Sequence, residues 1–140
     1  MVPFVLLMRA LKNVVIRFLD REASCMALFD TGSGVTAVQR SFFEESFGAK
    51  WSTLDKPLRL YWINGEPIQA DKYAQITIII DGFNLPETVL VIDNSIKEIE
   101  VEGRRIRLPK LMVGSGTMDK YGITLDPKEG VKLTKASLLL

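Results

Sequence analysis

The sequence predicts a mostly β fold with one or two short helices, in a single domain over residues 1–140. Two observations favour strands: short apolar runs rich in β-branched residues recur along the chain, and turn-forming residues separate them. The third observation is size. With 140 residues and 47% hydrophobic composition, the chain is long enough for one hydrophobic core and too short for two ordinary domains.

Two predicted strands form a hairpin that leads into a short polar loop. Residues 13–19 are rich in β-branched and aromatic side chains, and residues 24–29 form a second, small apolar strand after a polar turn at 20–22. The second strand runs directly into residues 30–34, Asp-Thr-Gly-Ser-Gly. The hairpin therefore presents Asp30 at the end of an apolar strand.

The Asn64-Gly65 dipeptide is the clearest hairpin signal in the chain. Both residue types tolerate a positive φ, which the two-residue turn of a β-hairpin requires, and a strand is predicted immediately before it at 58–63. Two further apolar strands are predicted at 75–80 and 88–92. Together these segments predict a meander of antiparallel strands.

The remaining predicted elements are one short helix and two hairpins. Ser41 is a suitable N-cap for a helix at 41–47, and Gly48 is expected to end it. The stretch 96–108 mixes charged residues with isolated Val and Ile, which indicates an exposed, peripheral hairpin. A last hairpin is predicted within 123–133, around a Pro- and Gly-containing turn.

The composition excludes several classes of function. The chain contains no His, so catalysis by Ser-His-Asp or Cys-His groups is impossible within it, and Cys25 is the only cysteine. We therefore expect no metal and no other cofactor. Lys and Arg number 18 against 17 Asp and Glu, a balance that predicts no nucleic-acid partner, and charges interrupt every apolar run, which predicts no membrane span. A single cysteine and the absence of a secretion-like charge order indicate a cytoplasmic protein.

The loop at Asp30 resembles the active-site loop of the retropepsin and pepsin families, in which an apolar pair precedes Asp-Thr/Ser-Gly. The order of further segments is similar to retropepsins too. The hairpin at 60–67 occupies the place of the flap, residues 111–114 (Leu-Met-Val-Gly) resemble the second apolar-apolar-Gly signature, and 118–123 resemble the short helix and turn that follow it. The resemblance covers roughly 13–133 and implies a closed retropepsin-like β-barrel with a flap hairpin.

This resemblance implies an aspartic endopeptidase without a cofactor. Such enzymes use two facing carboxylates, and the chain has no second Asp-Thr-Gly or Asp-Ser-Gly, so an identical subunit must supply the partner of Asp30. The implied partners are a second copy of the chain and a peptide or unfolded protein substrate. By the same resemblance, Thr31 bonds across the two-fold axis, Gly32 donates its backbone near the carboxylates, and Ser33 completes the loop. The apolar ends at 3–8 and 137–140 are expected to interleave into an intersubunit sheet.

The flap supplies the candidates for substrate binding. These are Tyr61, Trp62, Ile63, Asn64 and Gly65. An alternative is a retropepsin-like module that binds peptides or dimerises but cleaves little, and the intact Asp-Thr-Gly-Ser run argues against it. A small β-barrel of another kind ranks last, since it would make the ordered matches a coincidence.

Overall fold

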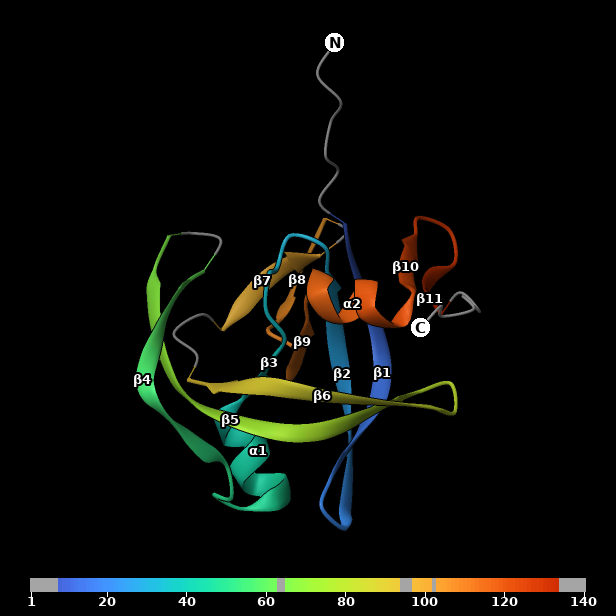
Figure 1. Ribbon diagram of the computed structural model, residues 1–140. Coiled ribbons are helices and arrows are strands. Elements are labelled where there is room, and N and C mark those ends of the chain that lie inside the picture. The colour runs from blue at the N-terminus through green and yellow to red at the C-terminus, as the bar shows by residue number, and fades with distance from the viewer. Residues whose placement is uncertain (1–7, 63–64, 94–96, 102, 134–140) are drawn as a thin grey trace.

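The computed structural model describes residues 8–62, 65–93, 97–101 and 103–133. Within these residues the chain forms strands and two short helices, which confirms the predicted mostly β fold (Figure 1). In chain order the elements are β1 (Arg9–Phe18), β2 (Arg21–Asp30), β3 (Ala37–Gln39), α1 (Arg40–Phe47), β4 (Ser52–Tyr61), β5 (Pro67–Ile80), β6 (Phe83–Ile92), β7 (Glu98–Val101), β8 (Arg104–Arg107), β9 (Leu111–Val113), α2 (Ser115–Tyr121), β10 (Ile123–Asp126) and β11 (Gly130–Leu133).

Six strands close into a barrel. The order in the main sheet is β1-β2-β9-β3-β6-β5-β4, and β1 also pairs with β5, which joins the two ends of the six-stranded part (Figure 1). The barrel is mixed, because β2 runs parallel to β9 and β3 runs parallel to β6. Closure removes free sheet edges from the barrel itself. Strand β4 lies outside the closure and, in the described part of the chain, pairs with β5 alone.

Aromatic side chains fill the space between α1 and the end of the barrel that it covers. Phe43 and Phe47 lie four residues apart and so share one face of the helix, where their rings pack 5.2 Å apart between centroids. Phe18 from β1 packs edge-on against Phe43 at 4.9 Å. All three side chains are buried, so this helix is held chiefly by its apolar face.

The ends of α1 fit the prediction only at Gly48. Gly48 adopts φ +84° and donates its N–H to the carbonyl of Glu44, as expected of a residue that ends a helix. The predicted N-cap at Ser41 is wrong, because the helix begins at Arg40 with Gln39 as its N-cap. Gln39 does not cap through its side chain, which instead donates to the carbonyls of Leu108 and Pro109.

Most strands extend further than predicted because ladder pairing includes polar residues at their ends. Strand β1 begins at Arg9 rather than Asn13, and its register places Arg9 opposite Asp30. Helix α2 likewise begins at Ser115, earlier than the predicted start at Met118. No helix in the described residues is long and apolar enough to cross a membrane.

Candidate active site

Asp30 is the last residue of β2, and its neighbours in the sequence hold it in place. Phe29, just before it, is fully buried and pairs with Val113 of β9. On the other side of β2, Asp30 lies opposite Arg9 of β1. The side chain of Asp30 retains 15% of its exposure, so the carboxylate stands at the rim of the barrel core, partly open to solvent.

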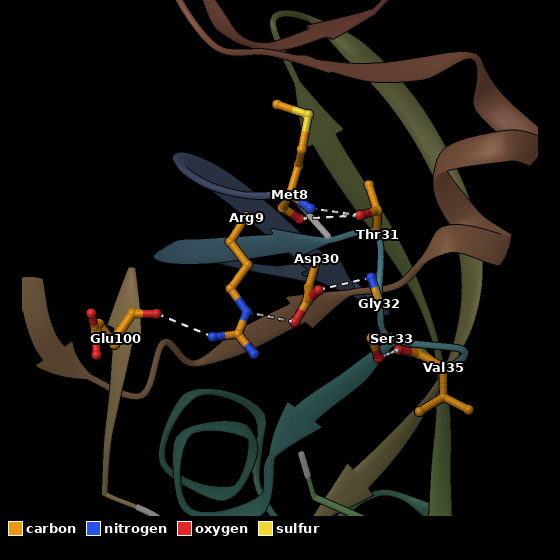
Figure 2. A network of polar contacts seen from close by, with 8 residues as sticks. All are labelled: Met8, Arg9, Asp30, Thr31, Gly32, Ser33, Val35 and Glu100. Atoms are coloured by element: carbon orange, nitrogen blue, oxygen red, sulfur yellow. Dashed lines mark hydrogen bonds and ion pairs between the residues drawn. The ribbon is translucent and has the colours of Figure 1, made fainter. Parts of the chain in front are cut away.

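The loop after Asp30 is organised by its own backbone. Gly32 N–H donates to Asp30 Oδ1 at 2.8 Å (Figure 2). Ser33 N–H donates to the Asp30 carbonyl at 3.1 Å. Ser33 Oγ donates to the Val35 carbonyl at 2.8 Å, which tightens the far side of the loop. The Gly32 N–H therefore donates to the Asp30 carboxylate of the same chain, next to which the sequence predicted it.

Thr31 joins the loop to the start of β1. Its N–H donates to the Met8 carbonyl at 3.0 Å. Its hydroxyl accepts from Met8 N–H at 2.9 Å (Figure 2). The hydroxyl also lies 3.3 Å from the Met8 carbonyl. The bond across a two-fold axis stays a prediction, since the structure is of a single chain.

Helix α2 and the residue before it support the loop from behind. Ser115 N–H donates to the Ser33 carbonyl at 2.8 Å, and Gly114 N–H donates to Thr36 Oγ1 at 3.0 Å. The Thr36 hydroxyl lies 2.6 Å from that of Thr117, and both side chains are buried. Gly114 has no room for a side chain, because a Cβ there would lie 2.5 Å from the Val35 carbonyl oxygen. The sequence analysis did not name Ser115 or Thr117 as residues of the site, although the Leu-Met-Val-Gly signature at 111–114 directly precedes them.

Arg9 is a second charged residue at the site, and the sequence analysis missed it. Its Nε donates to Asp30 Oδ2 at 3.0 Å, and its Nη1 donates to the Glu100 carbonyl at 3.1 Å (Figure 2). The arginine thus connects β2 to β7. It was missed because β1 was predicted to begin after it, and only the register shows that the two residues face each other.

A cavity of about 240 Å³ opens next to Asp30. Its walls are mostly aliphatic and aromatic, with Arg9 and Asp30 as the charged residues among the described lining. The lining residues are Arg9, Leu28, Asp30, Gly32, Ser33, Val35, Ala37, Leu60, Tyr61, Trp62, Ile68, Ile92, Ile99, Leu108 and Met112. Such a cavity suits an apolar group of a ligand lying beside the Asp30 carboxylate.

The hairpin between β4 and β5 forms one wall of this cavity, at the place predicted for the flap. Tyr61 and Trp62 both line it, and Tyr61 is 64% exposed. Trp62 Nε1 is buried without a hydrogen-bond partner in the described part of the chain. The predicted two-residue turn is wrong: Trp62 N–H donates to the Glu66 carbonyl and Gly65 N–H to the Trp62 carbonyl, which makes a three-residue loop.

Only part of the predicted flap can be placed. Gly65 has φ +86°, as the third residue of such a loop requires. Ile63 and Asn64 lie outside the described residues, and so do the chain ends at 3–7 and 137–140 that were predicted to interleave.

The hairpin of β7 and β8 also contributes to the wall of the cavity, so the prediction that it is peripheral is wrong. Ile99 of β7 lines the cavity, as does Leu108 just after β8. Leu108 N–H donates to the Lys97 carbonyl at 2.8 Å and closes the base of the hairpin. The charged residues that dominate its sequence face outward, and its isolated apolar residues face inward.

Neither a metal site nor a reactive thiol is found among the described residues. No group of three or more His, Cys, Asp or Glu side chains there could hold a metal ion. Cys25 is buried in the core, and burial raises the pKa of its thiol to about 11. The thiol is therefore protonated at neutral pH and unsuited to nucleophilic chemistry.

Comparison with solved structures identifies the fold. The chain is similar to the EIAV protease complexed with the inhibitor HBY-793, with a TM-score of 0.56 and 16% identity over 86% of this chain and 95% of that one. It is also similar to the retroviral protease-like domain of Ddi1 from Leishmania major, with a TM-score of 0.59 and 11% identity over 91% of this chain and 90% of that one. No family model and no curated protein matches the sequence. The fold is retropepsin-like, as the sequence predicted.

Proposed function

We propose that the protein is an aspartic endopeptidase that acts as a homodimer, with Asp30 of each subunit supplying one of two catalytic carboxylates. The observation that carries the proposal is the placement of Asp30. It ends a buried strand, accepts a backbone hydrogen bond from Gly32, and lines an apolar cavity under the β4–β5 hairpin. A retropepsin-like fold around this arrangement supports the proposal.

The proposed chemistry is general acid-base catalysis. Two carboxylates held close together share one proton, because like charges at short range disfavour double ionisation. The ionised Asp30 takes a proton from water, the water oxygen attacks the peptide carbonyl carbon, and the protonated Asp30 gives its proton to the carbonyl oxygen. Collapse of the tetrahedral intermediate then breaks the C–N bond, and a proton passes to the leaving amine. No covalent enzyme intermediate forms.

The walls of the cleft support an extended peptide with an apolar side chain next to the cleaved bond. Leu28, Ile99 and Met112 offer such a side chain aliphatic contacts. Strand β4 pairs with β5 alone in the described residues, so its other edge is available for backbone bonding to an extended substrate.

The direct test is proteolysis of a denatured protein by the purified chain, from acidic to neutral pH. Asp30→Asn is the matched control, because the amide has the same shape but cannot act as a base or hold the shared proton. We expect cleavage by the natural chain and none by the variant. Equal cleavage by both would rule out the aspartic mechanism.

The second candidate is a peptide-binding or dimerisation module with little activity. One observation favours it: in the single subunit both oxygens of Asp30 already accept hydrogen bonds from the protein, one from Gly32 and one from Arg9. The same assay decides between the two candidates, because a module of this kind would bind a peptide without cleaving it.

A further inference from the structure

Each oxygen of the Asp30 carboxylate accepts one hydrogen bond from the protein itself. Oδ1 accepts from Gly32 N–H at 2.8 Å, and Oδ2 accepts from Arg9 Nε at 3.0 Å (Figure 2). The first donor is a backbone group fixed by the loop. The second is a long side chain with 23% of its surface exposed, so it can turn away without disturbing the barrel.

The position of Arg9 conflicts with the proposed chemistry. Gly32 takes one lone pair of Oδ1, and the remaining lone pairs, those of Oδ2 above all, are left to receive the proton of the attacking water or to share a proton with the opposite carboxylate. A guanidinium bonded to Oδ2 fills that place with a donor and a positive charge. The arrangement in Figure 2 is therefore that of a resting subunit rather than a reacting one.

The arginine also lies where a substrate must lie. Arg9 is one of the residues that line the cavity, together with the apolar wall residues Leu28 and Ile99. Its Nη1 is held by the Glu100 carbonyl on the hairpin that carries Ile99. A peptide that fills the cavity competes with the guanidinium for the same space and for the same carboxylate.

We propose that Arg9 is an autoinhibitory latch, which bonds to Asp30 in the empty subunit and is displaced when a peptide enters the cleft. This proposal rests on the proposed function, because it concerns the regulation of the same site. The exposed carboxylate of Glu100, on the same hairpin, offers the released guanidinium a new partner. The latch needs two arrangements of one side chain and no change of fold.

A latch of this kind predicts tighter substrate binding when it is removed. If the closed form must open before a peptide binds, the apparent affinity is lowered by the fraction of subunits that are open. Arg9→Gln should then raise the affinity for a peptide about three- to tenfold, the range expected for the loss of one partly buried ion pair. In turnover, KM should fall by about the same factor.

The experiment is calorimetric titration of the full chain with a non-cleavable peptide that has a reduced amide between two leucines. Arg17→Gln is the matched control, since Arg17 lies on the same strand and pairs with Glu22 away from the cleft. Arg9→Lys keeps the charge but not the fork of donors, so its affinity should lie between those of the natural chain and Arg9→Gln. In an Asp30→Asn background, Arg9→Gln should change the affinity for the peptide by less than half of its effect in the natural chain, because Arg9 has lost its charged partner.

Each outcome decides the proposal. Weaker or unchanged binding by Arg9→Gln overturns the latch and leaves Arg9 as a structural tie between β2 and β7. An effect of equal size in the Asp30→Asn background overturns it as well. If the variants bind as expected but the natural chain does not cleave peptides, the latch stands and the proposed peptidase activity fails. If no variant binds the analogue, both fail.

Discussion

Replacing Gly114 by alanine should destabilise the protein and disturb the loop that holds Asp30. A Cβ at this position would lie 2.5 Å from the Val35 carbonyl oxygen and 2.8 Å from the Ser33 carbonyl oxygen. Both are backbone atoms, so the conflict cannot be relieved by a side-chain rotation. The loop or the start of α2 must move instead.

The size of the effect follows from these contacts. Overpacking of a well-packed site costs about 1–3 kcal/mol. Movement of the Ser33 carbonyl also weakens the bond it accepts from Ser115 N–H, which adds about 0.5–1.5 kcal/mol. We expect a total loss of about 2–4 kcal/mol in the free energy of unfolding.

Gly116→Ala is the matched control for this prediction. Gly116 lies two residues away in α2, and a Cβ there meets nothing within 4 Å. Alanine should stabilise the helix by up to about 1 kcal/mol. Urea unfolding at equal protein concentration measures both variants, and peptide cleavage reports on the loop. If Gly114→Ala were as stable and active as Gly116→Ala, the described packing of α2 against the loop would be wrong.

Three further changes test other parts of the structure. Burial raises the pKa of Cys25 from 9.0 to about 11, so the folded state keeps a thiol proton that the unfolded state loses; the resulting stability is complete below pH 9 and disappears as the pH rises to 11. Between pH 8.5 and 11, the free energy of unfolding measured with urea should therefore fall by up to about 2 kcal/mol less for Cys25→Ala than for the natural chain. An equal fall with pH in both proteins would contradict this. Ile99→Ala enlarges the cavity and should raise the ratio of kcat/KM for Phe- over Leu-containing peptides about tenfold. Ile106 pairs with Ile99 across the two strands but does not line the cavity, so Ile106→Ala should leave this ratio unchanged, and equal shifts would refute the role of Ile99. If the Thr31 hydroxyl bonds across the axis, Thr31→Ala should weaken the dimer by about 0.5–1.5 kcal/mol, measured by sedimentation. Ser33→Ala is the control, because the Ser33 hydroxyl bonds within the loop, and equal dissociation constants of the two variants would argue against the cross-axis bond.

Local sequence patterns were sufficient to predict the β content and the place of Asp30. The apolar strand that ends in Asp-Thr-Gly is a local feature, and so are the turns at Gly48 and Gly65 where positive φ is required. The turn at Gly65 was predicted one residue too short, because the choice between two and three loop residues depends on the register of β4 and β5.

Non-local pairing explains what the sequence did not reveal. Arg9 reaches Asp30 because β1 and β2 pair along their full length, and the pattern of apolar residues gave no reason to begin β1 so early. Ile99 and Leu108 reach the cavity because of how their hairpin packs on the barrel, although charged residues dominate the hairpin's sequence. The support from Ser115 to the Ser33 carbonyl joins residues 82 positions apart, a distance at which single-sequence patterns carry no information.

Mixing active and inactive subunits tests most directly whether two copies of Asp30 form one site. Natural chain at fixed concentration is mixed with increasing Asp30→Asn chain, allowed to exchange, and assayed for peptide cleavage under conditions that favour dimers. If each site needs both carboxylates, random pairing with an equal amount of variant should lower the cleavage rate to about half, and a large excess should abolish it. A rate that stays constant at every ratio, with exchange demonstrated by sedimentation of labelled chains, would contradict a shared site.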